Sequence, residues 1–269
     1  MTILNFPDVI INNNIMKAFK YIIILAVISL VFGCSKDDDS NDQQELQQFI
    51  SNICPTISGP IAAYWDNSHG LSVPMSQIPT ISNPGVQFIH PQYPALGFTM
   101  PVGYVAQEIT DQQTGTIGVN VFRNDNNVVW RYIPSSPFVG QVQINDIVAF
   151  ELNQIMQFHG FNGSPEVVCS TTQQSNEFGF PTTFGARLIR FGNFTALLTV
   201  QTHFMPSLGN TFISVTLASG PTTEFDGLVM ETYLPLHWQL LVISDDVRDS
   251  DLDGTPDNQD AAPFNPNIQ

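Results

Sequence analysis

"GARLIRFGNFTALLTVQTHFMPSLGNTFISVTLAS", residues 185–219, holds three short apolar segments separated by turns that contain Gly, Asn and Pro. Apolar and polar side chains alternate along much of their length, which is typical of strands that bury one face. Segments of the same kind come earlier in the chain: "GVQFIH", "GYVAQEI", "TIGVNVFR" and "NVVWRYI". Together they predict a largely antiparallel sheet.

A helix is expected among these strands at 146–159, "DIVAFELNQIMQFH". Asn145 or Asp146 can cap its start, and Gly160 is expected to end it. Apolar residues at helical spacing predict one buried face, made of Val148, Leu152, Ile155 and Met156.

A second helix is expected after the last strand segment, where "GPTTEFDG" begins at Gly220. Thr222 can cap this helix, and Pro235 is expected to end it because proline lacks the backbone N–H group. Nearer the N-terminus, "ELQQFISNIC" predicts a short amphipathic helix from Glu45, with an apolar face made of Leu46, Phe49, Ile50 and Ile53. A loop-rich stretch to about Pro84 is expected to follow.

This order of strands and helices predicts an α+β fold in which a largely antiparallel sheet is covered by helices. We expect a single globular domain with a disordered N-terminal tether and a calcium-loop tail. The predicted parts are a signal peptide at 1–33, with an alternative start at Met16, a lipidated tether at 34–44, a helix and loop-rich segment at 45–84, the α+β domain at 85–244 and the tail at 245–269.

Two stretches of the predicted domain resemble PsbP-like domains. They are "LGFTMPVGYVAQEI" at 96–109 and "ISVTLASGPTTEFDGLVMETYLPLHWQ" at 213–239. The resemblance implies a strand entered from a proline-glycine turn and a last strand that runs into a helix. It also implies a binding or accessory protein, and it supplies no catalytic residues.

The N-terminal apolar run "YIIILAVISLVF" ends at "VFGC", residues 31–34. Its twelve residues follow Lys17 and Lys20, as in a signal peptide, and are too few for a membrane-spanning helix. "VFGC" resembles the lipobox of bacterial lipoproteins, which implies lipidation of Cys34 and membrane attachment through that lipid. The alternative is an ordinary cleaved signal beside an incidental cysteine.

"SKDDDS", residues 35–40, resembles an export signal that directs some lipoproteins to the outer membrane and the cell surface. The resemblance implies a lipid-anchored, surface-exposed protein of the bacterial outer membrane. The alternative is a solvated tether, and both can hold at once.

The tail contains "DSDLDGTPDNQD", residues 249–260, with carboxylates at loop positions 1, 3, 5, 9 and 12 and glycine at 6. Calcium prefers six to eight oxygen ligands, and this spacing can supply them around one ion. The expected ligands are Asp249, Asp251, Asp253, Thr255, Asp257 and Asp260. The segment is similar to a single thrombospondin type 3 repeat; the alternative is a disordered acidic tail.

Once Cys34 carries lipid, two of the three cysteines remain, Cys54 and Cys169. In an oxidising compartment they are expected to form a disulfide, with two buried free thiols as the alternative.

Acidic residues outnumber basic ones by 24 to 8, for a formal net charge of −16. Such a charge repels phosphate backbones, so we expect no nucleic-acid partner. Only 12% of residues are charged, which predicts a surface of Asn, Gln, Ser and Thr. A protein or polysaccharide outside the cell is the expected kind of ligand.

Motifs of catalysis are sparse, and we identify no catalytic residue. "YWDNSHG", residues 64–70, is an expected loop in which Trp65 could stack on a sugar beside Asp66 and His69, although a packed tryptophan is the simpler interpretation. His159 and His203 are expected to be core or boundary residues. The function predicted is a calcium-binding accessory or binding module. The alternative is a secreted-type hydrolase of polysaccharide or peptide that uses Asp66 and His69.

Overall fold

The computed structural model describes residues 44–75, 79–93, 96–177 and 179–241, together with Thr255, Asn267 and Ile268. These residues belong to one compact unit, Asp42–Gln269. The predicted signal peptide, Cys34 and nearly the whole tether lie outside the described residues, as do the five aspartates of the predicted calcium loop.

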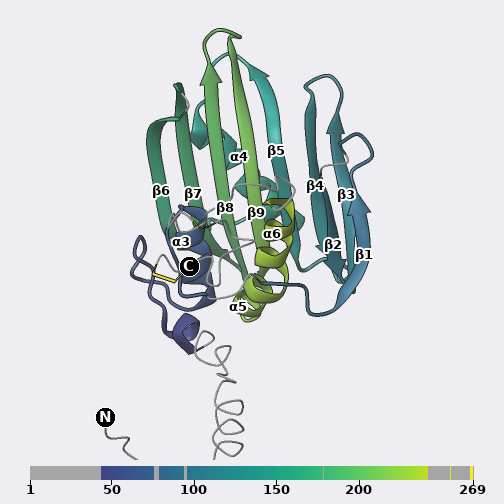
Figure 1. Cartoon of the computed structure of the whole chain (residues 1–269), viewed down its shortest axis with the longest axis vertical. Coiled ribbons are helices and arrows are strands. Elements are labelled where there is room, and N and C mark those ends of the chain that lie inside the picture. The colour runs from purple at the N-terminus through teal and green to yellow at the C-terminus, as the bar shows by residue number, and fades with distance from the viewer. Residues whose placement is uncertain are drawn as a thin grey trace, which may run out of the picture. The chain divides into compact units, whose positions relative to one another are not determined.

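A seven-stranded antiparallel sheet forms the centre of the domain (Figure 1). Its strand order is β3-β4-β5-β9-β8-β7-β6. The strands are β3 Tyr104–Asp111, β4 Thr116–Arg123, β5 Val129–Val139, β6 Glu166–Glu177, β7 Phe180–Phe191, β8 Phe194–Met205 and β9 Asn210–Pro221. The predicted α+β class with a largely antiparallel sheet is therefore confirmed.

Residues 185–219, where the strand pattern is clearest, form most of β7, β8 and β9. Tight turns connect them, and Gly192 and Gly209 occupy these turns with positive φ angles of 54° and 64°. The register runs without a shift from Phe191↔Phe194 to Thr182↔His203. Because side chains alternate along each strand, one face of the sheet receives Leu197 and the other Leu198.

A smaller sheet pairs β1 Pro84–Ile89 with β2 Gly97–Pro101, antiparallel to each other. Most of β1 is exposed, whereas Phe98 and Met100 of β2 point into the core. The predicted segment "GVQFIH" is thus a strand, but it lies outside the main sheet.

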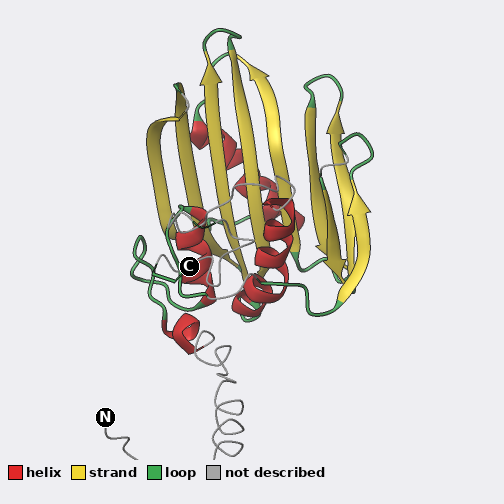
Figure 2. Cartoon of the chain, in the orientation of Figure 1, coloured by secondary structure: helices red, strands yellow, loops and turns green. Residues whose placement is uncertain are grey.

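Helices cover both faces of the main sheet, as Figure 2 shows. Helix α4, Ile144–Phe158, packs on β7 and β8. The opposite face carries α3, Pro60–Ser68, and a continuous helical segment at 225–241, called the C-terminal helix below. This segment comprises α5 Phe225–Leu228, a π-helical turn Val229–Tyr233 and α6 Leu234–Leu241. Within the described part of the chain, no helix is both long and apolar enough to cross a bilayer.

The buried face of α4 agrees with the prediction in part. Val148, Ile155 and Met156 are buried, whereas Leu152 is half-buried. The predicted N-caps are wrong, because the N-cap is Gln143 and it makes no side-chain cap bond. Gly160 follows the C-cap with a φ angle of 69°, so the predicted end of the helix is confirmed. The helix begins earlier than expected because Ile144 is itself buried and starts the apolar face.

The prediction that Pro235 ends the last helix is wrong. The chain passes through Pro235 and remains helical to Leu241. A wider turn precedes the proline, in which the Leu234 N–H group bonds the Val229 carbonyl. Such a turn lets a helix accommodate a residue that lacks the N–H group. Thr222 is not a cap either: its hydroxyl lies 3.0 Å from that of Thr195.

Two expectations for the N-terminal part need correction. The predicted helix ends at residue 48, and Ile50 is 59% exposed in a bridge to Ser58. The expected loop before Pro84 contains α3, which Pro60 opens at a position that favours proline. Its N-cap is Gly59, which has no side chain, and Asp226 Oδ1 instead accepts the Ile61 N–H group at 3.0 Å.

Candidate functional site

Two hollows lie next to each other along the C-terminal helix. The first, of about 480 Å³, lies between the β1–β2 hairpin, the segment 79–81 and α6. Its walls are mainly apolar and include Ile81, Phe98, Pro235 and Trp238. Because prolines form part of the walls, this hollow is expected to change shape little when a ligand enters.

The second hollow, of about 470 Å³, lies at the other end of the helix, where α5 and the π-helical turn face the segment 81–83 and the start of β3. Its lining is polar and includes Tyr104, Arg123, Glu224, Glu231 and Thr232. Ile81 borders both hollows, so we treat them as one site and call it the helix–hairpin trough.

Gln239 of α6 holds the hairpin at one wall of this trough. Its Oε1 accepts the Thr99 N–H group at 2.7 Å, and its Nε2 donates to the Thr99 carbonyl at 3.0 Å. Behind this wall Phe98 meets Trp130 edge-on, with ring centroids 5.7 Å apart. The apolar hollow therefore has a floor of packed aromatic rings that belongs to the core.

Arg123 is the cation of the polar hollow, and two carboxylates already neutralise it. Its guanidinium donates to Asp125 at 2.8 Å and to Glu224 at 2.7 Å. The hydrogen bond to Asp125 raises the pKa of Arg123, and Arg123 in turn lowers the pKa of Asp125 to about 2. The hydroxyl groups of Tyr104 and Thr232 lie 3.2 Å apart beside this group, and burial raises the pKa of Tyr104.

Glu231 is exposed and lines the same hollow. Among the residues that the structure describes, no cation lies within ion-pair distance of its carboxylate. Within the part of the chain that the structure describes, the polar hollow therefore offers a negative charge without a cationic partner, next to an arginine that two carboxylates already bind.

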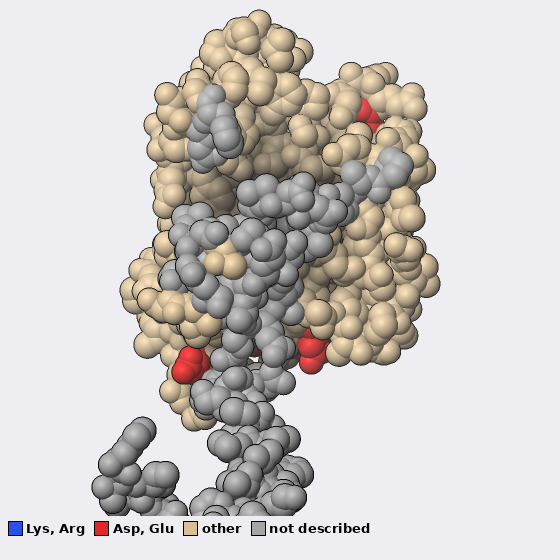
Figure 3. All heavy atoms as spheres, viewed as in Figure 1, with Lys and Arg blue, Asp and Glu red and all other residues tan. Residues whose placement is uncertain are grey.

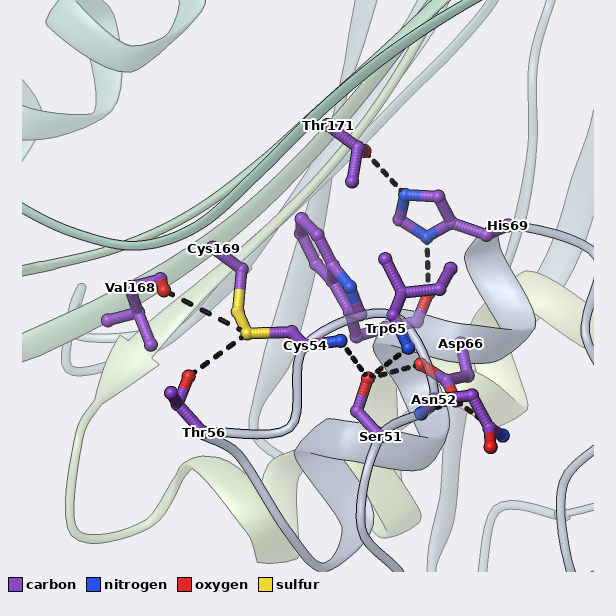
Figure 4. The surroundings of a disulfide bond; sticks show 11 residues. Ser51, Asn52, Cys54, Thr56, Trp65, Asp66, His69, Val168, Cys169 and Thr171 are labelled. Carbon is purple, nitrogen blue, oxygen red and sulfur yellow. Dashed lines mark hydrogen bonds between the residues drawn. A yellow bond between two sulfur atoms is a disulfide. The ribbon is translucent and has the colours of Figure 1, made fainter.

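The predicted loop "YWDNSHG" is instead the end of α3 (Figure 4). Trp65 is fully buried and cannot stack on a sugar. Asp66 is also fully buried, and its carboxylate accepts hydrogen bonds from the Ser51 hydroxyl and, at 2.7 Å, from the Asn52 N–H group. This network fastens the segment before α3 to the helix.

The ring of His69 contacts other groups than those bound by Asp66. Its Nδ1 lies 2.7 Å from the Trp65 carbonyl, and its Nε2 lies 2.6 Å from the Thr171 hydroxyl on β6. Burial lowers the pKa of His69. Among the described residues, Asp66 and His69 bond different partners and no hydrogen bond joins their side chains, so the geometry gives no support to a hydrolase that uses this pair.

The expected disulfide between Cys54 and Cys169 is present, and Figure 4 shows its surroundings. It joins the segment before α3 to the edge strand β6 with a Cα–Cα distance of 6.2 Å. The bond spans 115 residues of sequence, so it removes many conformations from the unfolded chain.

The two histidines that were expected in the core or at its boundary, His159 and His203, both contact hydroxyl groups of the domain. His159 stacks on Phe194 at 3.9 Å, and its Nε2 lies 3.1 Å from the Ser219 hydroxyl. Burial lowers the pKa of His159 to about 4. His203 Nδ1 lies 2.9 Å from the Thr182 hydroxyl.

One buried ion pair is not apparent from the sequence patterns. Glu151 of α4 faces the sheet and binds Arg131 of β5, whose Nε donates to Asn120 at 2.7 Å. Glu151 lies three residues after Val148 and four before Ile155, so helical spacing places it on the buried face without indicating its partner. The trough was also missed, because no sequence motif joins residues 79–83 to the C-terminal helix.

Of the predicted calcium ligands, the structure describes only Thr255, which is half-buried. The remaining ligands lie outside the described residues, so the calcium loop stays a prediction. Elsewhere in the described chain, no group of three or more His, Cys, Asp or Glu side chains is placed to hold a metal.

Neither a family model nor a curated protein matches this chain. Among solved structures, cyanobacterial PsbP (CyanoP) from Synechocystis sp. PCC 6803 is 8% identical and covers 61% of this chain and 91% of its own, with a TM-score of 0.31. LpqN of Mycobacterium tuberculosis, involved in cell envelope biogenesis, is 15% identical and covers 56% of this chain and 83% of its own, with a TM-score of 0.27. At these TM-scores neither similarity assigns a function to the chain.

Proposed function

We propose that the chain is a lipid-anchored binding module of the bacterial outer membrane, exposed at the cell surface, whose ligand occupies the helix–hairpin trough. The trough carries this proposal, because it joins an apolar and a polar hollow of 480 and 470 Å³. Both volumes fall in the range of ligand pockets, roughly 300 to 1,000 Å³. By contrast, Asp66, His69 and Arg131 are committed to internal bonds.

The surface of the domain also favours binding to a neutral or basic partner. Figure 3 shows few charged side chains on the face that carries the C-terminal helix, among the residues that it colours. Where charge does gather in the trough, it is mainly acidic. We also propose that the aspartates of 249–260 bind one calcium ion that orders the acidic tail, a role that the loop spacing supports.

The anchor is tested by replacing Cys34. In Cys34→Ala we expect the protein to leave the membrane fraction and to stop incorporating labelled palmitate. Membrane association with unchanged label incorporation would contradict the lipid anchor. Protease treatment of intact cells separates the external face, where the domain is cut, from the internal face, where it is protected.

Ligand binding in the trough is tested with ¹⁹F NMR on the whole protein labelled with 5-fluorotryptophan. The chain has three tryptophans: Trp238 lines the apolar hollow, Trp130 packs against the lining residue Phe98, and Trp65 in the core serves as the internal reference. We expect millimolar benzyl alcohol, a small neutral apolar probe, to shift the Trp238 resonance saturably and to leave the Trp65 resonance unchanged.

Two variants give this test its controls. Gln87→Phe places a ring at the rim of the apolar hollow and should abolish the shift, because Gln87 lines the hollow from an exposed position. Gln174→Phe makes the same change on β6, at the opposite edge of the sheet, and should leave the shift intact. An unmoved Trp238 resonance in the parent protein would remove the trough as a ligand site.

A further inference from the structure

We infer that the ligand of the helix–hairpin trough is an extended peptide segment in which apolar residues are followed by lysine or arginine. This inference rests on the proposed function, because it names the chemistry of the ligand that the trough holds. It follows from the division of the trough into an apolar end and an acidic end.

The apolar end selects an aliphatic or aromatic side chain. Its walls combine Ile81, Phe98 and Trp238 with prolines from three segments of the chain. The amide group of Gln239, the polar side chain that α6 contributes to this hollow, is already bonded to Thr99 and to the Pro235 carbonyl. Burial of an apolar group is therefore the main interaction that this end offers, worth about 25 cal/mol per Å².

The acidic end selects a cation. Arg123 supplies one positive charge against the two carboxylates of Asp125 and Glu224, and Glu231 adds a further negative charge that no described cation pairs, so the polar hollow is net negative as far as the described residues show. Tyr104 and Thr232 line the same hollow, and their hydroxyl groups supply further hydrogen-bond acceptors. An ammonium or guanidinium group can bind such oxygens, whereas a carboxylate or phosphate would be repelled.

The net charge of the whole chain also favours a ligand that carries a cation. The chain has a formal net charge of −16, and its described residues contain four arginines and no lysine. The protein therefore attracts cations and repels anionic lipids and fatty-acid head groups. The ligand must also span two hollows that share Ile81, each of them larger than a single side chain fills. A small amine would occupy one end only, so an extended peptide fits the trough better.

The inference is tested on the fluorotryptophan-labelled whole protein in nanodiscs of zwitterionic lipid. The probe is an acetylated, amidated hexapeptide of three apolar residues followed by three lysines, and its matched counterpart carries serine in place of lysine. We expect the lysine peptide to shift the Trp238 resonance with at least about fivefold higher affinity than the serine peptide. The difference should shrink as salt is raised from about 0.01 to 0.15 M, because exposed charges are screened.

Glu231→Gln is expected to lower the affinity for the lysine peptide about two- to fivefold and to leave the serine peptide unaffected. Glu166→Gln removes the same charge from β6, at the far edge of the sheet, and should change neither. Equal effects of the two variants would reduce the preference to the net charge of the chain and overturn the assignment of Glu231.

The outcomes separate the two proposals. If benzyl alcohol shifts Trp238 but the lysine peptide binds no more tightly than the serine peptide, the trough stands and the basic class of ligand is wrong. If neither probe shifts Trp238, both proposals fail. If the lysine peptide binds equally well to Gln87→Phe, it occupies another surface and the inference is overturned.

Discussion

Gln239 on the C-terminal helix bonds both backbone groups of Thr99 on β2, accepting its N–H at 2.7 Å and donating to its carbonyl at 3.0 Å. These are the two bonds that a neighbouring strand would make, so one helix side chain takes the place of a strand at this edge of β2. The contact holds the hairpin against the helix and so keeps the apolar hollow open between them.

Replacing Gln239 with alanine should therefore destabilise the domain. The two hydrogen bonds to Thr99 are lost together with a longer one, 3.3 Å, to the Pro235 carbonyl, at a net cost of about 1 to 3 kcal/mol in the free energy of unfolding. The measurement is denaturant unfolding combined with hydrogen exchange, in which the Thr99 amide should lose protection. Gln154→Ala, an exposed change on α4, is the matched control. Unchanged protection of Thr99 would mean that the hairpin is held by packing alone.

The Arg131–Glu151 pair gives a second prediction. Glu151→Leu alone should cost about 3 kcal/mol, because it leaves the arginine without its carboxylate in a largely buried position. Arg131→Met combined with Glu151→Leu should cost less than about 1 kcal/mol, since apolar replacements of both partners need no pairing. A double-mutant cycle of unfolding free energies measures this difference, and additive losses would show that the pair is not coupled.

Ile155 and Leu152 of α4 differ in burial, so truncating each to alanine should lower the free energy of unfolding by different amounts. Ile155 is buried, and Ile155→Ala should cost about 2 to 5 kcal/mol. Leu152 is half-buried, so Leu152→Ala should cost less, about 1 to 2 kcal/mol. Denaturant unfolding of both variants tests the order. A larger loss in Leu152→Ala would mean that α4 is rotated from the position described.

His159 makes stability depend on pH. Its pKa falls from the usual 6.5 to about 4 in the folded protein because of burial, so the unfolded chain binds more protons between these values. Stability from this group is complete above pH 6.5 and is lost as the pH falls toward 4. We expect about 1 to 2 kcal/mol for this half-buried ring. The difference in unfolding free energy between the parent and His159→Gln, followed from pH 7 to 4, isolates the contribution; a constant difference would contradict it.

Calcium should bind the acidic tail with a dissociation constant of roughly 10⁻⁴ to 10⁻³ M, the range of extracellular calcium sites. Ligation offsets the mutual repulsion among the aspartates of 249–260. Isothermal titration of the purified protein beside an Asp251→Ala, Asp253→Ala double variant measures the binding, and magnesium should substitute poorly. Equal heats from the two proteins would mean that the segment is an acidic tail without a site.

Local patterns in the sequence predicted seven strands, β1, β3, β4, β5, β7, β8 and β9, and most of α4, whereas β2 and the edge strand β6 were not predicted. Alternation over 185–219 predicts strands because neighbouring side chains in a strand must point to opposite faces, a relation that needs no distant partner. Two cysteines in an oxidising compartment likewise predicted a disulfide. Only the structure shows that Cys54 and Cys169 lie 6.2 Å apart.

Only the tertiary structure shows the caps, packing contacts and hydrogen bonds that residues far apart in the sequence provide for each other. Helix α3 was missed because its N-terminus is capped by Asp226, 165 residues away, and not by the glycine before it. The end of the last helix was misplaced because packing of Leu236 and Trp238 in the core outweighs the missing N–H group of Pro235. The trough depends on Gln239 and Thr99, 140 residues apart, and no local pattern encodes their meeting because it exists only once the chain has folded.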